Sequence, residues 1–123
     1  MRTASVEPAR EFEMGRSSVR LRHVADAWLE EDELVTFRTD SGTELDLTRK
    51  GWGYYATPSL NGRLRKHGLR AALTSRAGRM YLVLVEEGRE PDFRAYLAEE
   101  EMEVVAWLDS DEAVAQATAR LRA

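Results

Sequence analysis

Residues 80–85 read Met80-Tyr81-Leu82-Val83-Leu84-Val85, an unbroken apolar run. Successive side chains of a strand point to opposite faces of a sheet, so this run is apolar on both faces. The pattern is typical of a central strand covered on both sides, because a strand with one wet face alternates apolar and polar residues. The run therefore predicts the middle of a sheet.

The segments around this strand predict its neighbours. Residues 69–75 precede a glycine-containing turn, so we expect them to pair with the apolar strand as a hairpin. Residues 91–101 carry apolar side chains at helical spacing, and residues 102–108 predict another strand. Strand, helix and strand together predict one parallel crossover. Asp109 and Glu112 resemble a capping box at the start of a last helix.

The first half of the chain predicts more strands. Residues 1–16 show no period and are expected to form a flexible arm. A strand is predicted from residue 19 to 29, and a hairpin from residues 34–39 and 44–48 around a turn rich in polar residues. The alternation of the second hairpin strand places Asp46 on its solvent face.

These elements predict an α+β domain over residues 17–123. We expect a single, mostly antiparallel sheet of about five to six strands, with two to three helices packed mainly on one face. The apolar runs assign the core to two adjacent strands, with Leu82, Val83, Leu84, Val104 and Trp107 buried.

Composition bounds the class of protein. A chain of 123 residues is the size of one domain. The absence of cysteine excludes disulfides, thiolate catalysis and Cys-ligated metals. No apolar run approaches the roughly 18 residues that span a bilayer, and the N-terminal residues do not resemble a signal peptide. We therefore expect a soluble cytoplasmic protein with no membrane partner.

Charge is distributed unevenly along the chain. The net charge is −4, yet residues 47–85 contain eight Lys or Arg and no Asp or Glu. A clustered set of cations can bind phosphates, but nucleic-acid-binding domains are usually basic overall, and the pI here is about 5.3. The pattern therefore favours an anionic small molecule or an acidic protein surface over nucleic acid. The competing interpretation is that the basic strands face acidic helices of the same chain or of a neighbour.

Residues 49–67, the basic-aromatic segment, contain the candidate binding site. Thr57 followed by Pro58 is a typical helix start, and the segment predicts a helix over residues 58–67 that Gly68 terminates. The free N–H groups at such a start favour an anion, and nearby aromatic rings can stack on a ligand. An ordinary capped helix and core-filling aromatics are the alternative interpretation. The candidate ligand-binding residues are Arg49, Trp52, Tyr54, Thr57, Ser59, Asn61 and Arg63.

Catalytic and metal signals are weak. His67 is the one candidate general acid or base, and a surface histidine at a helix end explains it equally well. The two histidines have no metal-ligand spacing, and the carboxylates of residues 99–103 lack the pattern of a calcium loop. No metal and no cofactor is expected.

Three functions follow from these observations. The first is a small non-catalytic accessory protein that binds a phosphate- or carboxylate-bearing ligand, or an acidic partner, through residues 49–67. The second is a small enzyme acting on a phosphorylated or carboxylated metabolite, with His67 beside a concave pocket. The third is a protein-docking subunit of a larger complex, whose basic stretch docks on the larger partner and which predicts a flat, exposed apolar patch. Self-association is left open.

Overall fold

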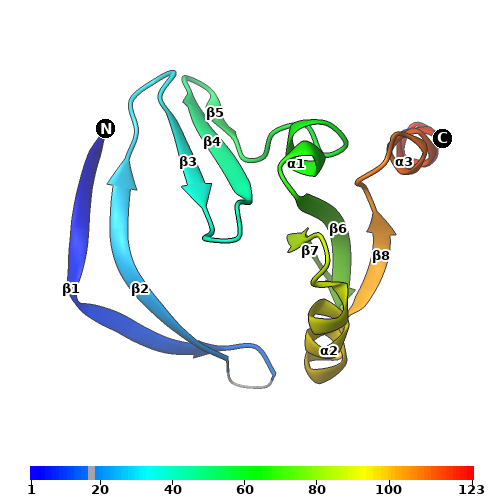
Figure 1. Cartoon of the computed structure of the whole chain (residues 1–123), viewed down its shortest axis with the longest axis horizontal. Coiled ribbons are helices and arrows are strands. Elements are labelled where there is room, and N and C mark those ends of the chain that lie inside the picture. Colours follow the sequence, from blue (N-terminus) through cyan, green and yellow to red (C-terminus); the bar gives the residue numbers. More distant parts are fainter. Residues whose placement is uncertain (17–18) are drawn as a thin grey trace.

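A computed structural model describes residues 1–16 and 19–123. The fold is a mixture of helices and strands, as predicted, with eight strands and three helices in the described ranges. The strands form three small antiparallel sheets instead of one. Figure 1 shows these sheets side by side along the longest axis, with the two termini at opposite sides. The prediction of a single sheet of five to six strands is therefore corrected.

The first sheet is a long hairpin of β1 (Arg2–Met14) and β2 (Val19–Trp28). Residues 2–14, expected to be an arm without regular structure, pair with β2 at residues 2–5 and 10–14, with an irregularity between Ser5 and Arg10. Most side chains of both strands are exposed, which explains why no apolar alternation marks β1 in the sequence. Ser17, with which the predicted domain begins, lies outside the described residues, so the division of the chain there stays a prediction.

The second sheet contains β3 (Leu34–Arg38), β4 (Glu44–Lys50) and β5 (Gly53–Tyr55), in that order. The hairpin predicted for β3 and β4 is confirmed. Its turn includes Gly42 at φ +100, a conformation that glycine adopts without strain.

The third sheet contains β6 (Leu69–Arg76), β7 (Arg79–Glu86) and β8 (Glu103–Trp107). The β6–β7 hairpin is confirmed, but the strand order is β7-β6-β8. Both outer strands are antiparallel to β6, so β7 and β8 run in the same direction with β6 between them. The prediction that residues 80–85 form the central strand is therefore wrong for the single chain, because β7 is an edge.

The helices are α1 (Arg63–Lys66), α2 (Glu90–Glu100) and α3 (Asp111–Leu121). The helix α2 packs on the third sheet, where the ring of Phe93 meets that of Trp107 edge to face at 5.8 Å. Ser110, and not Asp109, caps α3 by accepting the N–H of Ala113 at 3.1 Å. No helix within the described residues combines the length and apolarity needed to cross a membrane.

The buried core differs from the predicted one. Leu82 is 44 % exposed, and the four other residues predicted for the core are half-buried at most. The difference has a physical reason: the edge position of β7 leaves its side chains without a neighbour on one side. The buried apolar side chains of the described residues are instead centred on β6 and are Leu64, Leu69, Ala71, Ala72, Val85 and Leu97.

Candidate functional site

The helix predicted for the basic-aromatic segment is four residues long. It begins at Arg63, and residues 57–62 form turns instead of the first helical turns. Ser59 explains this locally, because its Oγ accepts the N–H of Arg63 at 2.9 Å and so stabilises a turn. Gly68 follows the helix at φ +83, as predicted for a terminating glycine. The anion-holding helix start at Thr57 is therefore absent, and that prediction is wrong.

The aromatic side chains of the segment lie on the surface. Trp52 is 69 % exposed, and Tyr54 and Tyr55 are also exposed. The rings of Trp52 and Tyr55 meet edge to face at 5.5 Å, and the guanidinium of Arg49 lies 5.6 Å from the ring of Tyr54. The alternative interpretation, in which these aromatic rings fill the core, is therefore wrong for all three.

The structure brings only part of the predicted site together. Thr57, Ser59 and Arg63 line a common hollow of about 550 Å³ whose other walls include Tyr55 and Asp46. The other four candidate residues do not line it. Asn61 donates to Asp111 at 2.9 Å, Arg49 donates to the carbonyl of Lys50, and Trp52 and Tyr54 face solvent.

Arg63 already has anionic partners in its own chain. Its Nε donates to the carboxylate of Asp46, and its Nη2 lies 3.6 Å from Glu44. The hydrogen bond from Arg63, assisted by one from Thr36, holds the pKa of Asp46 below its ordinary value of 3.8. The same contact raises the pKa of Arg63. Asp46, predicted to face solvent, is thus buried beneath the cation it neutralises.

His67 has similar surroundings. Its Nδ1 lies 3.4 Å from Glu44 and its Nε2 lies 3.1 Å from Nη1 of Arg63. A polar hollow of about 330 Å³ lies beside His67, with Ser41 and Thr43 on its wall. Both hydroxyls donate to Glu86, which lowers the pKa of that carboxyl, and neither is bonded to His67. Among the residues that the structure describes, no hydroxyl is therefore positioned for activation by the histidine.

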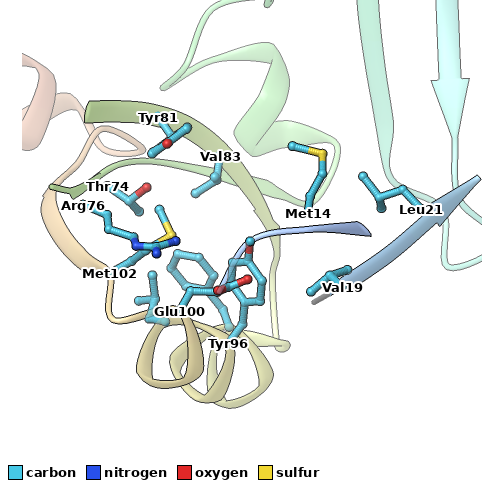
Figure 2. Close-up of a pocket in the computed structure, with 13 residues that line it drawn as sticks. Met14, Val19, Leu21, Thr74, Arg76, Tyr81, Val83, Tyr96, Glu100 and Met102 are labelled. Carbon is cyan, nitrogen blue, oxygen red and sulfur yellow. The ribbon is translucent and has the colours of Figure 1, made fainter. Parts of the chain in front are cut away.

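A second cavity was not foreseen from the sequence. The α2 hollow, of about 350 Å³, lies between β6, β7, α2 and the tip of the β1–β2 hairpin (Figure 2). Thr74 is fully buried on its wall, and its Oγ1 has no hydrogen-bond partner among the described residues. Figure 2 shows that the lining side chains come from segments far apart in the chain. No local motif could have revealed them, and they are Met14, Gly15, Val19, Leu21, Thr74, Arg76, Tyr81, Val83, Phe93, Tyr96, Leu97, Glu100 and Met102.

The hairpin tip closes this hollow. The backbone N–H of Arg16 donates to the buried carboxylate of Glu100 at 2.5 Å, and the Arg16 guanidinium lies 2.8 Å from Glu101. Gly15, at φ +78, passes so close to Glu100 that a Cβ there would lie 2.1 Å from its carboxylate oxygen. Any larger residue at position 15 would have to displace that carboxylate.

Large apolar side chains are exposed over much of the molecule. Three of them, Met80, Tyr81 and Leu82, are consecutive on β7. The side chains of α3 are also poorly covered: none in the helix is buried, and Leu121 is 86 % exposed. The others in the described ranges are Met1, Met14, Leu21, Val24, Trp28, Leu34, Phe37, Trp52, Tyr54, Tyr55, Tyr96 and Val105.

The described residues contain no group of three or more side chains that could hold a metal ion. Comparison with family models, with curated proteins and with solved structures finds no match to this chain.

Proposed function

We propose that this chain is a non-catalytic docking subunit that works by binding another protein through apolar surface. The observation that carries the proposal is the exposed area, which is 8939 Å² for a chain of 14.0 kDa. Size scaling gives about 6,700 Å² for a compact monomer of this mass, so roughly a third more surface is exposed than expected. This total surface includes the large apolar side chains named above, and contiguous exposed apolar surface on a small domain is typical of an interface.

The electrostatics supports docking over anion binding at residues 49–67. An anion at Arg63 would have to displace Asp46 and Glu44, which already neutralise the guanidinium. Lys50 is likewise held by Asp32 at 2.5 Å. The competing interpretation of the sequence, in which the basic strands face acidic helices, agrees with these contacts only in that the partners are carboxylates of the same chain, because Asp46 and Glu44 lie on β4 and Asp32 precedes β3. The seven candidate residues for an anionic ligand stay a prediction.

Binding of a hydrophobic fluorescent dye to the native, dilute protein tests the proposal. We expect dye fluorescence in buffer that disappears when the apolar surface is covered by a partner, while urea unfolding stays cooperative. A chain that binds no dye when it is dilute and monomeric has no exposed docking surface, and the proposal fails.

A second candidate function rests on the α2 hollow. A buried hydroxyl without a partner is costly, by about 1–3 kcal/mol, unless something in the cavity bonds to it. The hollow also contains Arg76, which takes part in no ion pair of the described residues. Apolar walls with a few polar groups are typical of small-molecule sites. The chemistry fits a compact apolar carboxylate.

Thermal denaturation with a series of short-chain carboxylates tests this candidate, with the matching alcohols as controls. Carboxylates should raise the melting temperature of the wild type, and less so that of Arg76→Ala. Thr74→Val removes the hydroxyl at constant shape, so it should preserve stability without ligand and reduce the shift. Equal shifts in all three proteins, or none, exclude a ligand site in the hollow.

A further inference from the structure

The outer edge of β7 is unoccupied in the single chain. The strand lies at the end of its sheet, and backbone groups of residues 79–85 make no hydrogen bonds in the described ranges except those to β6. From Met80 to Val85 the strand contains no charge, proline or glycine. Residues of these kinds commonly prevent an edge strand from pairing with another chain. The edge is long, apolar and open.

The sequence and the position of this strand disagree. Its two-sided apolar pattern is typical of a central strand, yet in the single chain it is an edge. One further strand beside β7 removes the disagreement. Resting on the docking function proposed above, we propose that the partner is a second copy of this chain, whose β7 pairs antiparallel with the first β7 about a two-fold axis. Two three-stranded sheets then become one continuous sheet with β7 near its middle.

Charge at the strand ends favours a second copy in this orientation. Arg79 begins β7 and takes part in no ion pair within the described residues, while Glu86 and Glu87 lie at the other end, where Glu87 is also 3.4 Å from Arg65 of its own chain. Antiparallel pairing brings Arg79 of each copy to the acidic end of the other. Parallel pairing would instead place Arg79 of one copy beside Arg79 of the other, which is unfavourable because like charges repel.

The exposed area is large enough for such a contact. A standard interface buries about 800 Å² on each partner, and the exposed surface of the whole chain, of which β7 is one part, exceeds that of a compact monomer by roughly 2,200 Å². The faces of the two sheets also match in this arrangement. A two-fold axis perpendicular to the sheet leaves every side chain of each copy on the face that it occupies in the single chain. The helix α2 of each copy would therefore lie on one face and α3 of each copy on the other.

The same symmetry predicts the register in a testable form. In an antiparallel pair, two residues directly opposite each other have their side chains on the same face of the sheet. The two-fold axis must therefore pass between one residue of β7 and the same residue of the other copy. Cα atoms of that residue are about 4.5–5.5 Å apart, within reach of a disulfide. One position further along, the two residues are offset by about 7 Å along the strands, which is beyond reach.

Because the natural chain contains no cysteine, each single-cysteine variant has only the introduced thiol available for cross-linking. Each residue from Met80 to Leu84 is replaced singly by cysteine, the purified chain is oxidised, and cross-linked dimer is measured. Val105→Cys on β8, where Val105 is 52 % exposed, is the matched control at the other edge. We expect cross-linking to peak at one position of β7 and to be low at Val105. Equal cross-linking at every position, a maximum at Val105, or none at all overturns the pairing.

Sedimentation of two lysine variants provides a second readout that does not depend on disulfide chemistry. Leu82→Lys should weaken the dimer by at least about tenfold, because a charge on an edge opposes pairing, while Val105→Lys should leave it unchanged. Circular dichroism confirms that both variants fold. A wild-type chain that is monomeric at every concentration overturns the second copy as partner. If that monomer still binds the hydrophobic dye, docking to a different protein survives; if it does not, both proposals fail.

Discussion

Arg63 and Asp46 are 17 positions apart in the chain, and their contact changes the interpretation of the whole basic stretch. The sequence shows Arg63 among other cations and places Asp46 on the solvent side of its strand. In the structure the side chain of Arg63 reaches Asp46 on β4, and the carboxylate is buried. A cation that looks available for a ligand in the sequence is thus part of the chain's own structure.

This contact predicts a pH-dependent contribution to stability. The folded-state pKa of Asp46 is lowered, so its stabilising effect is complete above the unfolded value near 3.8 and is lost as the pH falls through the folded value. Asp46→Asn should lower the free energy of unfolding by about 1.5 kcal/mol at neutral pH, the low end for charged hydrogen bonds because Arg63 is half exposed. Urea midpoints of both proteins should converge in acid. Asp40→Asn, in the exposed turn, is the control, and a difference that persists at the lowest pH contradicts the assignment.

Leu64 is the fully buried residue of the short helix α1. Leu64→Ala should lower the free energy of unfolding by about 2–5 kcal/mol, because it removes buried methyl groups and leaves a cavity. Leu34→Ala makes the same chemical change at an exposed position and should change stability by less than about 0.5 kcal/mol. Chemical denaturation of both variants measures the contrast. Equal effects would mean that α1 does not anchor the core.

Elements with strong local signals were predicted well. The hairpins of β3–β4 and β6–β7, the helix α2 and the terminating Gly68 follow from turn residues and apolar spacing, and the structure contains them. Elements whose formation depends on pairing with residues far away in the chain were predicted poorly. The strand β1 has no period because both its faces are largely exposed, and a serine contact shortens the helix predicted from residue 58. The order of the third sheet also required knowledge of which strand β8 would join.

Apart from its contacts with α2 through Gly15 and Arg16, the hairpin of β1 and β2 projects away from the rest of the described chain (Figure 1). Its two strands pair with each other, and neither packs extensively on another element. An isolated two-stranded hairpin is marginally stable in water, so amide hydrogens of β1 and β2 should exchange much faster than those of β6. Hydrogen exchange followed by mass spectrometry provides the comparison. Protection in β1 equal to that in β6 would show that the hairpin is held by contacts this structure lacks.

At the scale of the whole molecule, cations and carboxylates largely neutralise one another. Arg65 and Arg70 both reach Asp109, and Arg70 also lies 3.8 Å from Glu90. Four of the eight cations of residues 47–85 are thus paired with carboxylates in the described residues: Lys50, Arg63, Arg65 and Arg70. Many large apolar side chains, in contrast, remain exposed to solvent. We infer a protein partner because such a partner would cover them.

The effect of salt on stability and on nucleic-acid binding should distinguish an internally paired basic stretch from a polyanion-binding surface. Because Lys50, Arg63, Arg65 and Arg70 have carboxylate partners in the chain, added salt should lower stability slightly, by less than about 1 kcal/mol, through screening of exposed pairs. Gel shifts with RNA and DNA should show no complex even at low salt. A salt-sensitive shift at low ionic strength would instead identify the basic stretch as a polyanion-binding surface.

The mass of the unmodified protein in solution tests the central claim, that a second copy covers the β7 edge. Light scattering during size-exclusion chromatography should give twice the chain mass of 14.0 kDa, falling toward the single-chain value only on strong dilution. A mass of 14.0 kDa at every concentration would contradict the claim and leave β7 an edge strand.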